Sequence, residues 1–178
     1  MFSRLLALCL ICSTCLAAPA GADQIGLENK IKAAYLFNFL LFAEWPALEG
    51  SGAGTPVRLC VIGSESLGQL LAELGNRDIK GRPLAIESLP GLNSRKQNTC
   101  HLLFVDRKLP TNAANVAEQL PRENVLTVSD APGFAESGGM IGFYQEDGRI
   151  KIAINLRRAR EARVTLSAKL LEVARIVD

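Results

Sequence analysis

The stretch VRLCVIGSESLGQLLAEL, residues 57–74, decides the fold class because a strand pattern in it passes directly into a helix pattern. Residues 57–63 are mostly apolar and rich in β-branched side chains, which is typical of a buried strand. Ser64 can then cap a helix over residues 65–74. A strand that leads straight into a helix is the repeating unit of α/β proteins, so this stretch predicts a sheet with helices packed on it.

The same alternation continues on the C-terminal side of this unit. We predict strands at residues 83–89, 101–106 and 124–130. A helix is expected near residues 111–120, where Pro110 and the cap former that follows it mark its start. Strands separated by helices favour parallel pairing through crossover connections, so this part of the chain reads as a run of βαβ units.

The pattern then changes into a hairpin followed by a helix. GGMIGFYQ at residues 138–145 and GRIKIAINL at residues 148–156 are strand-like, and the Asp-Gly pair between them is a strong hairpin signal. The last helix is predicted over residues 167–176. The whole pattern predicts a three-layer α/β sandwich, Rossmann-like, on a mixed and mostly parallel sheet with a C-terminal hairpin and helix.

The stretch IKAAYLFNFLLFAEWP, residues 31–46, belongs to a predicted helix over residues 28–43 that Pro46 ends. Apolar side chains surround most of the helix, so we expect it to be buried on more than one side. Its apolar run is interrupted by Asn38 and is shorter than the roughly 20 residues that cross a bilayer. The helix is therefore expected to pack on the sheet, with Asn38 either hydrogen-bonded internally or in contact with water.

The N-terminus has the composition of a signal peptide. A single positive charge precedes an apolar run over residues 5–16, and the sequence Ala20-Gly21-Ala22 has the small-x-small pattern of a signal peptidase site. We predict cleavage after Ala22, with cleavage after Ala20 as the near alternative. Either cut predicts an exported protein.

Export defines the domain organisation. Residues 1–22 are the predicted signal peptide, and residues 23–178 form a single α/β domain that is not membrane-spanning after cleavage. An uncleaved anchor is disfavoured because twelve apolar residues fall short of the roughly 20 that span a bilayer. A lipid anchor at Cys15 is disfavoured because the residues before it lack the usual Leu and the usual Gly or Ala.

Export also changes the meaning of the five cysteines. Cys9, Cys12 and Cys15 leave with the signal peptide, so Cys60 and Cys100 are the pair that remains. In an oxidising compartment a single remaining pair favours a disulfide. Closing this loop would stabilise the fold by roughly 4 kcal/mol on a chain-entropy estimate.

The charge balance and residue content give no sign of catalysis or of nucleic-acid binding. The 20 Lys and Arg nearly cancel the 18 Asp and Glu, so no net field favours a polyanion as partner. His101 is the only histidine, which leaves neither a ligand cluster for a metal nor a base for a nucleophile. We therefore expect a protein without cofactor, metal or enzymatic activity, in which His101 is structural.

Residues 63–68, GSESLG, lie between a predicted strand and a predicted helix, where phosphate-binding loops lie in α/β proteins. The segment lacks both the GK[ST] ending and the GxGxxG spacing of such loops, so a plain strand-to-helix turn is favoured. The alternatives are a weakly bound anion at the helix N-terminus and a ligand pocket lined by this segment.

One basic cluster is a candidate for contact with a partner protein. LRRAREAR at residues 156–163 includes Arg157, Arg158 and Arg160. A solvated helix face is the simpler interpretation. A docking patch is the alternative, because arginine is favoured at interfaces and pairs with carboxylates through two parallel hydrogen bonds.

Aromatic side chains at the end of the first predicted helix are the second candidate. For Tyr35, Phe39, Phe42 and Trp45, core packing is the simpler interpretation, and an exposed aromatic strip that a partner covers is the alternative. Because the proline after it pushes Trp45 out of the helical region, we expect Trp45 to be half exposed and available for binding.

Several segments together resemble a known family. They are the helix KAAYLFNFLLFAEWP, the strand LCVIG, the segment CHLLFVD and the long stretch SDAPGFAESGGMIGFYQEDGRIKIAINLRRAREARVTLSAKLLEVARIV. In their order and spacing they are similar to the YfiR-like family of periplasmic bacterial proteins, over residues 32–177.

The resemblance implies regulation without catalysis. The namesake of the family represses a membrane-bound diguanylate cyclase by binding the periplasmic sensory domain of that enzyme, which lowers cyclic-di-GMP and biofilm formation. Some relatives act with histidine kinases or other receptors, so a periplasmic small-molecule binding protein that reports to such a receptor is the alternative. The sequence also leaves open whether the protein forms a homodimer. Cys60 and Cys100 match a family disulfide, but the namesake's second cysteine pair, near residues 134–142, is missing here.

Overall fold

A computed structural model describes residues 20–109 and 111–178. The strands are β1 (Ala43–Glu44), β2 (Val57–Ile62), β3 (Asp78–Ile79), β4 (Arg82–Leu89), β5 (Leu102–Val105), β6 (Leu126–Ser129), β7 (Ile141–Glu146), β8 (Arg149–Asn155), β9 (Thr165–Leu166) and β10 (Arg175–Val177). Within the described residues, eight of them form one sheet in the order β10-β8-β7-β6-β5-β2-β4-β3, and β1 pairs with β9. The predicted α/β fold on a mixed, mostly parallel sheet is confirmed.

The direction of the strands places the site described below. From β4 through β2, β5 and β6 to β7 all neighbours are parallel, whereas β8 runs antiparallel to β7. The chain leaves β2 for β4 on one side and then returns to β5 on the other side. In open α/β sheets, such a reversal of direction opens a crevice between the carboxyl ends of two neighbouring strands, here β2 and β5. Ligands commonly bind in this crevice.

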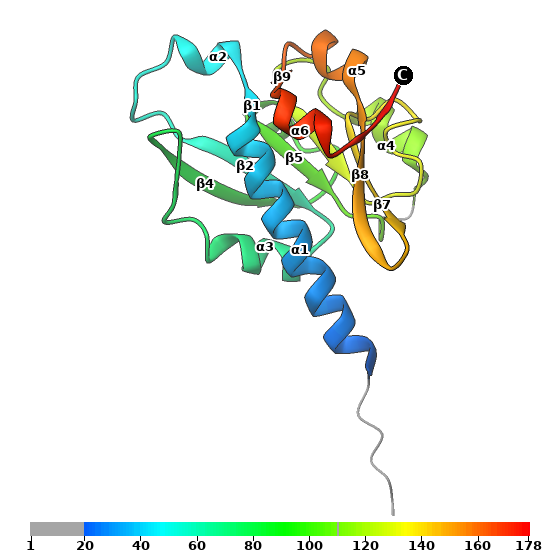
Figure 1. The fold of residues 1–178 in the computed structure, drawn as a ribbon. Coiled ribbons are helices and arrows are strands. Elements are labelled where there is room, and N and C mark those ends of the chain that lie inside the picture. The colour runs from blue at the N-terminus through cyan, green and yellow to red at the C-terminus, as the bar shows by residue number, and fades with distance from the viewer. Residues whose placement is uncertain (1–19, 110) are drawn as a thin grey trace, which may run out of the picture.

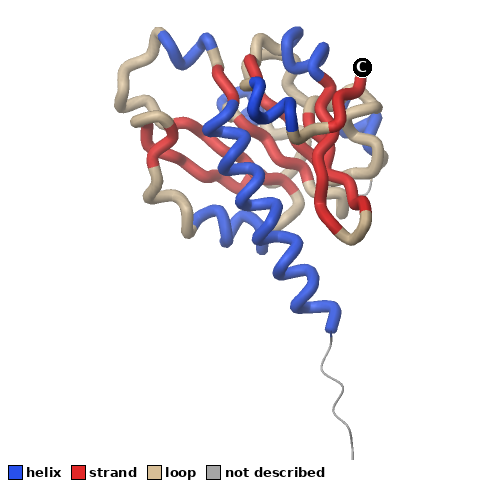
Figure 2. Tube along the Cα trace, viewed as in Figure 1, coloured by secondary structure: helices blue, strands red, loops and turns tan. Residues whose placement is uncertain are grey.

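Helices cover both faces of the sheet. They are α1 (Ala20–Phe42), α2 (Pro46–Glu49), α3 (Glu65–Ala72), α4 (Ala113–Gln119), α5 (Leu156–Glu161) and α6 (Ala168–Glu172). Figure 1 shows α1 in blue crossing one face of the sheet, with its first turns extending past the edge. Figure 2 shows the same arrangement as a helical layer over red strands. α3 and α6 pack beside α1, and α4 packs on the opposite face.

Strand β2 explains why the sheet is buried on both sides. Leu59 and Val61 join the core cluster beneath α1, whereas Cys60 and Ile62 join the cluster beneath α4. This alternation follows from the two-residue period of a strand. The predicted disulfide between Cys60 and Cys100 is confirmed, and both cysteines are buried between β2 and the start of β5.

The first helix differs from its prediction in extent and in burial. α1 begins at Ala20, ahead of the predicted start at residue 28, and ends at Phe42. Its buried residues form one stripe: Asn29, Lys32, Ala33, Leu36, Phe39 and Leu40. The remaining aromatic side chains are half buried, and Asn38 is exposed to water. In the part of the chain that the structure describes, no helix has the length and apolar character that a bilayer crossing requires.

Residues 1–19 of the predicted signal peptide lie outside the described residues. The predicted cleavage after Ala22 and the single domain over residues 23–178 therefore stay predictions.

The C-terminal region confirms one prediction and corrects another. The hairpin turns at Asp147 and Gly148, whose φ angles of 51° and 70° are those of a type I′ turn. The helix predicted over residues 167–176 is wrong in its second half, because α6 ends at Glu172 and residues 175–177 form β10. β10 pairs in parallel with β8, so contacts distant in sequence override the local helix pattern here.

Candidate functional site

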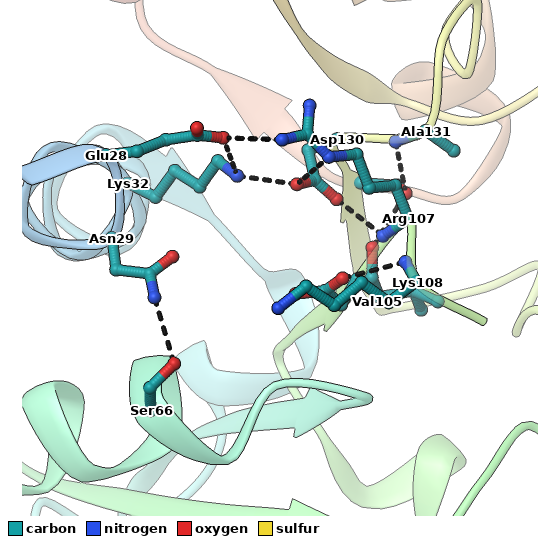
Figure 3. A network of polar contacts seen from close by, with 11 residues as sticks. Glu28, Asn29, Lys32, Ser66, Val105, Arg107, Lys108, Asp130 and Ala131 are labelled. Atoms are coloured by element: carbon teal, nitrogen blue, oxygen red, sulfur yellow. Dashed lines mark hydrogen bonds and ion pairs between the residues drawn. The ribbon is translucent and has the colours of Figure 1, made fainter. Parts of the chain in front are cut away.

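Charged side chains gather where the parallel strands β5 and β6 end. Asp130 directly follows β6 and is buried, with 4% of its side chain exposed. Its Oδ2 accepts a hydrogen bond from Nζ of Lys32 at 2.5 Å, and its Oδ1 accepts the backbone N–H of Arg107 at 2.7 Å. Figure 3 shows these contacts joining α1 to the two strand ends. Glu28, Lys32, Arg107 and Asp130 are called the edge cluster below.

Lys32 is the centre of the edge cluster. α1 carries it on the buried stripe, where 5% of its side chain is exposed, and Nζ also lies 2.5 Å from the carboxylate of Glu28. The guanidinium of Arg107 lies 3.2 Å from the same carboxylate. Two cations therefore alternate with two anions, and a buried charge is stable only when it is paired in this way.

A serine hydroxyl fixes the turn that presents Asp130. The hydroxyl of Ser129 donates to the carbonyl of Val105 at 2.7 Å and accepts the N–H of Ala131 at 3.1 Å. The side-chain amide of Asn29 donates to the hydroxyl of Ser66 at 2.9 Å, which ties α1 to the start of α3. Residues 28–32, in the middle of α1, are thus held against the carboxyl edge of the sheet (Figure 3).

The charges of the edge cluster decide the protonation of Glu28. Partial burial opposes ionisation, but the hydrogen bond from Lys32 and the positive charges of Lys32, Arg107 and Lys108 outweigh it. The pKa of Glu28 is therefore lowered from its ordinary value of 4.5. Glu28 is a paired carboxylate at neutral pH, which suits a fixed electrostatic contact better than proton transfer.

A cavity of about 280 Å³ opens beside the edge cluster. Its lining residues are Glu28, Lys32, Arg107, Asp130, Pro132, Gly133, Phe143, Tyr144, Gln145 and Ile150. The β7–β8 hairpin supplies an apolar wall and the edge cluster a charged floor, so the cavity suits a small molecule with both an apolar and a polar part. Its carboxylates are held by cations, so the arrangement favours binding over catalysis.

The arginines predicted to contact a partner lie at the other end of the sheet. β8 runs antiparallel to β7, so α5, which follows β8, lies at the amino ends of the parallel strands. Arg157 is 60% exposed and pairs with Glu161 at 2.8 Å, and Arg160 is exposed. Arg158 is 16% exposed, and its Nε donates to the carbonyl of Gly138 at 3.1 Å. The fold therefore leaves Arg157 and Arg160 accessible and uses Arg158 as a structural tie.

A hollow of about 410 Å³ lies beside these arginines. Its lining residues are Pro46, Leu156, Arg160, Arg163, Val164, Thr165, Leu166 and Leu171. These residues and Arg157 are called the α5 surface below. An apolar hollow with arginines at its margin has the composition of a protein interface.

The aromatic candidates pack in or against the core, as the simpler interpretation expects. Trp45 is 3% exposed and packs edge-on against His101, with ring centroids 5.8 Å apart, so the expected half exposure is wrong. Pro46 begins α2 directly after Trp45, and β1 is paired with β9, which together direct the indole into the core. Phe42 is half buried, and its carbonyl accepts the N–H of Ser167 at 2.9 Å.

His101 has a structural role, as predicted. Its Nδ1 accepts the backbone N–H of Arg58 at 2.9 Å, so this nitrogen is unprotonated. Burial, and then the charges of Arg58 and Arg82, lower the pKa of His101 from its ordinary value of 6.5. Within residues 20–109 and 111–178, no group of three or more His, Cys, Asp or Glu side chains is placed to hold a metal ion.

Sequence reasoning missed the edge cluster. Lys32 and Asp130 are 98 residues apart, and no local pattern connects them. Two signals were present in the sequence. Lys32 lies on the apolar stripe of the first helix, and Asp106 and Asp130 each end a predicted strand. A lysine in such a stripe needs a buried partner, and a strand end can supply one.

Comparison with known proteins places the chain in a family. Comparison with curated proteins gives no match. The family model described as YfiR/HmsC-like matches residues 29–175, which include Lys32, Arg107 and Asp130 of the edge cluster, the disulfide and α5. The chain therefore belongs to the YfiR/HmsC-like family.

Proposed function

We propose that the protein is exported to the periplasm and binds the periplasmic sensory domain of an inner-membrane diguanylate cyclase. Binding represses the cyclase and lowers cyclic-di-GMP and biofilm formation. The match to the YfiR/HmsC-like family over residues 29–175 is the observation that carries this proposal. The role is regulatory, and the protein catalyses no reaction of its own.

The disulfide supports the proposed compartment. Cys60 and Cys100 are 40 residues apart and joined in the core. Structural disulfides of this kind form and persist in oxidising compartments such as the bacterial periplasm. The disulfide therefore agrees with the signal peptide predicted from residues 1–22.

The α5 surface is the proposed docking site. Arg157 and Arg160 can reach carboxylates of a partner, while the apolar hollow beside them can take an apolar side chain. Trp45 is left out of the contact because it is buried, and Arg158 is left out because it already binds the carbonyl of Gly138. Phe42, half buried at the end of α1, lies outside the hollow and is a secondary candidate.

Repression requires a difference in affinity between two states of the cyclase. A ligand that binds both states equally shifts nothing, so the protein must bind the inactive conformation of the sensory domain more tightly. A shift from mostly active to mostly inactive cyclase needs about a 10⁴-fold difference in affinity.

Deletion of the gene, combined with co-purification, tests this function. The deletion strain is expected to have raised cyclic-di-GMP and more biofilm, and the chain is expected to retain the sensory domain of the cyclase encoded nearest to it. A deletion strain with unchanged cyclic-di-GMP, together with failure to retain any cyclase sensory domain, would contradict the proposal.

A second function is favoured by the cavity beside the edge cluster. A periplasmic small-molecule binding protein would hold its ligand against Phe143 and Ile150 and would report to a membrane receptor or histidine kinase. A ligand that co-purifies with the protein and raises its melting temperature would support this function.

A further inference from the structure

A second hollow, of about 450 Å³, lies in the crevice between the carboxyl ends of β2 and β5. Its lining residues are Gly63, Ser64, Glu65, Ser66, Gln69 and Lys108. The crevice is the point where the chain changes direction across the sheet, which is where α/β proteins commonly bind ligands.

Ser64 is the first sign that the hollow has an occupant. Only 8% of the residue is exposed, yet its hydroxyl has no hydrogen-bond partner among the described residues. It occupies the N-cap position of α3 in an extended conformation but does not cap the helix. The hydroxyl is not one of the partnerless side-chain atoms that are closed off from solvent, and the residue lines the hollow. Water or a bound ligand in the hollow can therefore be its partner.

The first turn of α3 adds further donors. The first hydrogen bond within α3 joins the N–H of Gly68 to the carbonyl of Ser64 at 3.1 Å. The N–H groups of residues 65–67 therefore have no acceptor in the part of the chain that the structure describes. Free amides and the helix dipole make such a helix start attractive to anions.

Two glycines at the start of α3 occupy positions without room for a side chain. Gly63 has a φ of +86°, and a Cβ on it would lie 3.2 Å from Cβ of Asp106. A Cβ on Gly68 would lie 2.9 Å from Oγ of Ser88. Both glycines let the start of α3 sit directly against the strand ends, which places the free amides at the crevice.

Two charges face the hollow with opposite effects. Lys108 lines it, and its backbone is fixed because Oδ1 of Asp106 accepts the N–H of Lys108 at 2.8 Å. Glu65 also lines it, and its carboxylate accepts a hydrogen bond from the side-chain amide of Gln69 at 3.4 Å. The ammonium of Lys108, the hydroxyl of Ser64 and the three amides attract an anion. The carboxylate of Glu65 repels it, which limits the charge of the anion that can bind and the affinity of the site.

We propose that this crevice binds a small oxyanion, either a phosphate group or a carboxylate group. Lys108, the hydroxyl of Ser64 and the amides of residues 65–67 are the ligand contacts. The site is independent of the proposed docking at α5, because it lies at the opposite end of the sheet.

Titration of the purified, disulfide-bonded protein with inorganic phosphate, followed by ¹H–¹⁵N NMR, tests the site. The amide signals of residues 65–67 are expected to shift and saturate. A parallel titration with acetate at matched ionic strength distinguishes a phosphate site from a carboxylate site, since the anion that the crevice prefers will saturate at the lower concentration.

Four variants separate this site from general charge effects. Ser64→Ala and Lys108→Gln are each expected to weaken binding by roughly fivefold or more, and Glu65→Gln to tighten it by about threefold. Lys169→Gln, an exposed lysine on α6, is the matched control and should change nothing. Ser64→Ala should fold normally because its hydroxyl does not cap α3.

Two outcomes would overturn the proposal. One is the absence of saturable shifts at residues 65–67 with both anions. The other is binding that Ser64→Ala and Lys108→Gln leave unchanged, or that Lys169→Gln weakens equally. Retention of the cyclase sensory domain by Ser64→Ala is measured separately, so failure of the anion site and failure of the proposed repression are distinguishable.

Discussion

The two ends of the sheet use charge in opposite ways. In the edge cluster, Lys32 and Asp130 are buried and pair across 98 residues of sequence. On the α5 surface, Arg157 and Glu161 are exposed and pair within one helical turn. A buried pair between distant segments fixes the fold because neither charge tolerates the loss of the other. An exposed local pair contributes little to stability and leaves its arginine free for a partner.

The largest expected effect on stability is at Trp45, which lies in the core at the α5 end of the sheet. Trp45→Ala should lower the free energy of unfolding by about 3 to 5 kcal/mol, because the indole is 3% exposed and its removal leaves a cavity. Denaturant unfolding of the variant and of Trp45→Phe measures this, and the phenyl ring should restore part of the loss. Weaker binding to the cyclase sensory domain per folded molecule, with unchanged stability, would place Trp45 in the interface instead.

The edge cluster should give the next largest effect. Lys32→Met should lower the free energy of unfolding by about 3 kcal/mol, because Asp130 keeps its charge in a buried position with a weakened set of partners. The double variant Lys32→Met with Asp130→Asn removes both charges and should recover part of the loss. A double variant that is less stable than the single variant would show that the pair is not the source of the effect.

Acid should affect the edge cluster through Glu28. Its pKa is lowered in the folded state, so its contribution to stability is full above the ordinary value of 4.5 and is lost as pH falls through the folded value. The free energy of unfolding, measured between about pH 5 and pH 3, should fall less steeply for Glu28→Gln than for the unaltered protein. Equal slopes for the two proteins would mean that Glu28 is not coupled to folding.

Some features of the molecule follow from local sequence patterns, and others depend on contacts between distant segments. The strand at residues 57–62 and the Asp147-Gly148 turn follow from short patterns, because local periodicity and turn chemistry determine them. The disulfide follows instead from the cysteine count, because the predicted export leaves Cys60 and Cys100 as the remaining pair. β10 was missed because its pairing with β8 decides its conformation. The edge cluster was missed for the same reason, since a sequence does not show which strand end will meet Lys32.

The burial of Trp45 illustrates a third limit. A proline after an aromatic residue predicts that the helix ends but not the direction that the chain then takes. Here the pairing of β1 with β9 sets that direction, and it turns the indole inward. Exposure next to a helix end therefore depends on tertiary contacts that the local pattern does not contain.

The smallest effect on stability is expected for the exposed arginines. The double variant Arg157→Ala with Arg160→Ala should change the free energy of unfolding by no more than about 0.5 kcal/mol, because exposed ion pairs contribute little. Glu161 keeps its bond to Arg158 at 2.6 Å, so no carboxylate loses its last partner. Affinity for the cyclase sensory domain, measured by calorimetry, should nevertheless fall by about tenfold or more if these side chains dock.

Arg149→Ala is the control that makes this prediction specific. Arg149 is also exposed and carries the same charge, but it lies at the hairpin turn, at the same end of the sheet as the edge cluster. A general attraction between a basic protein and an acidic partner would weaken with either change and would be screened by salt. Loss of affinity confined to the double variant would instead locate docking at the α5 surface, and equal losses would remove α5 from the interface.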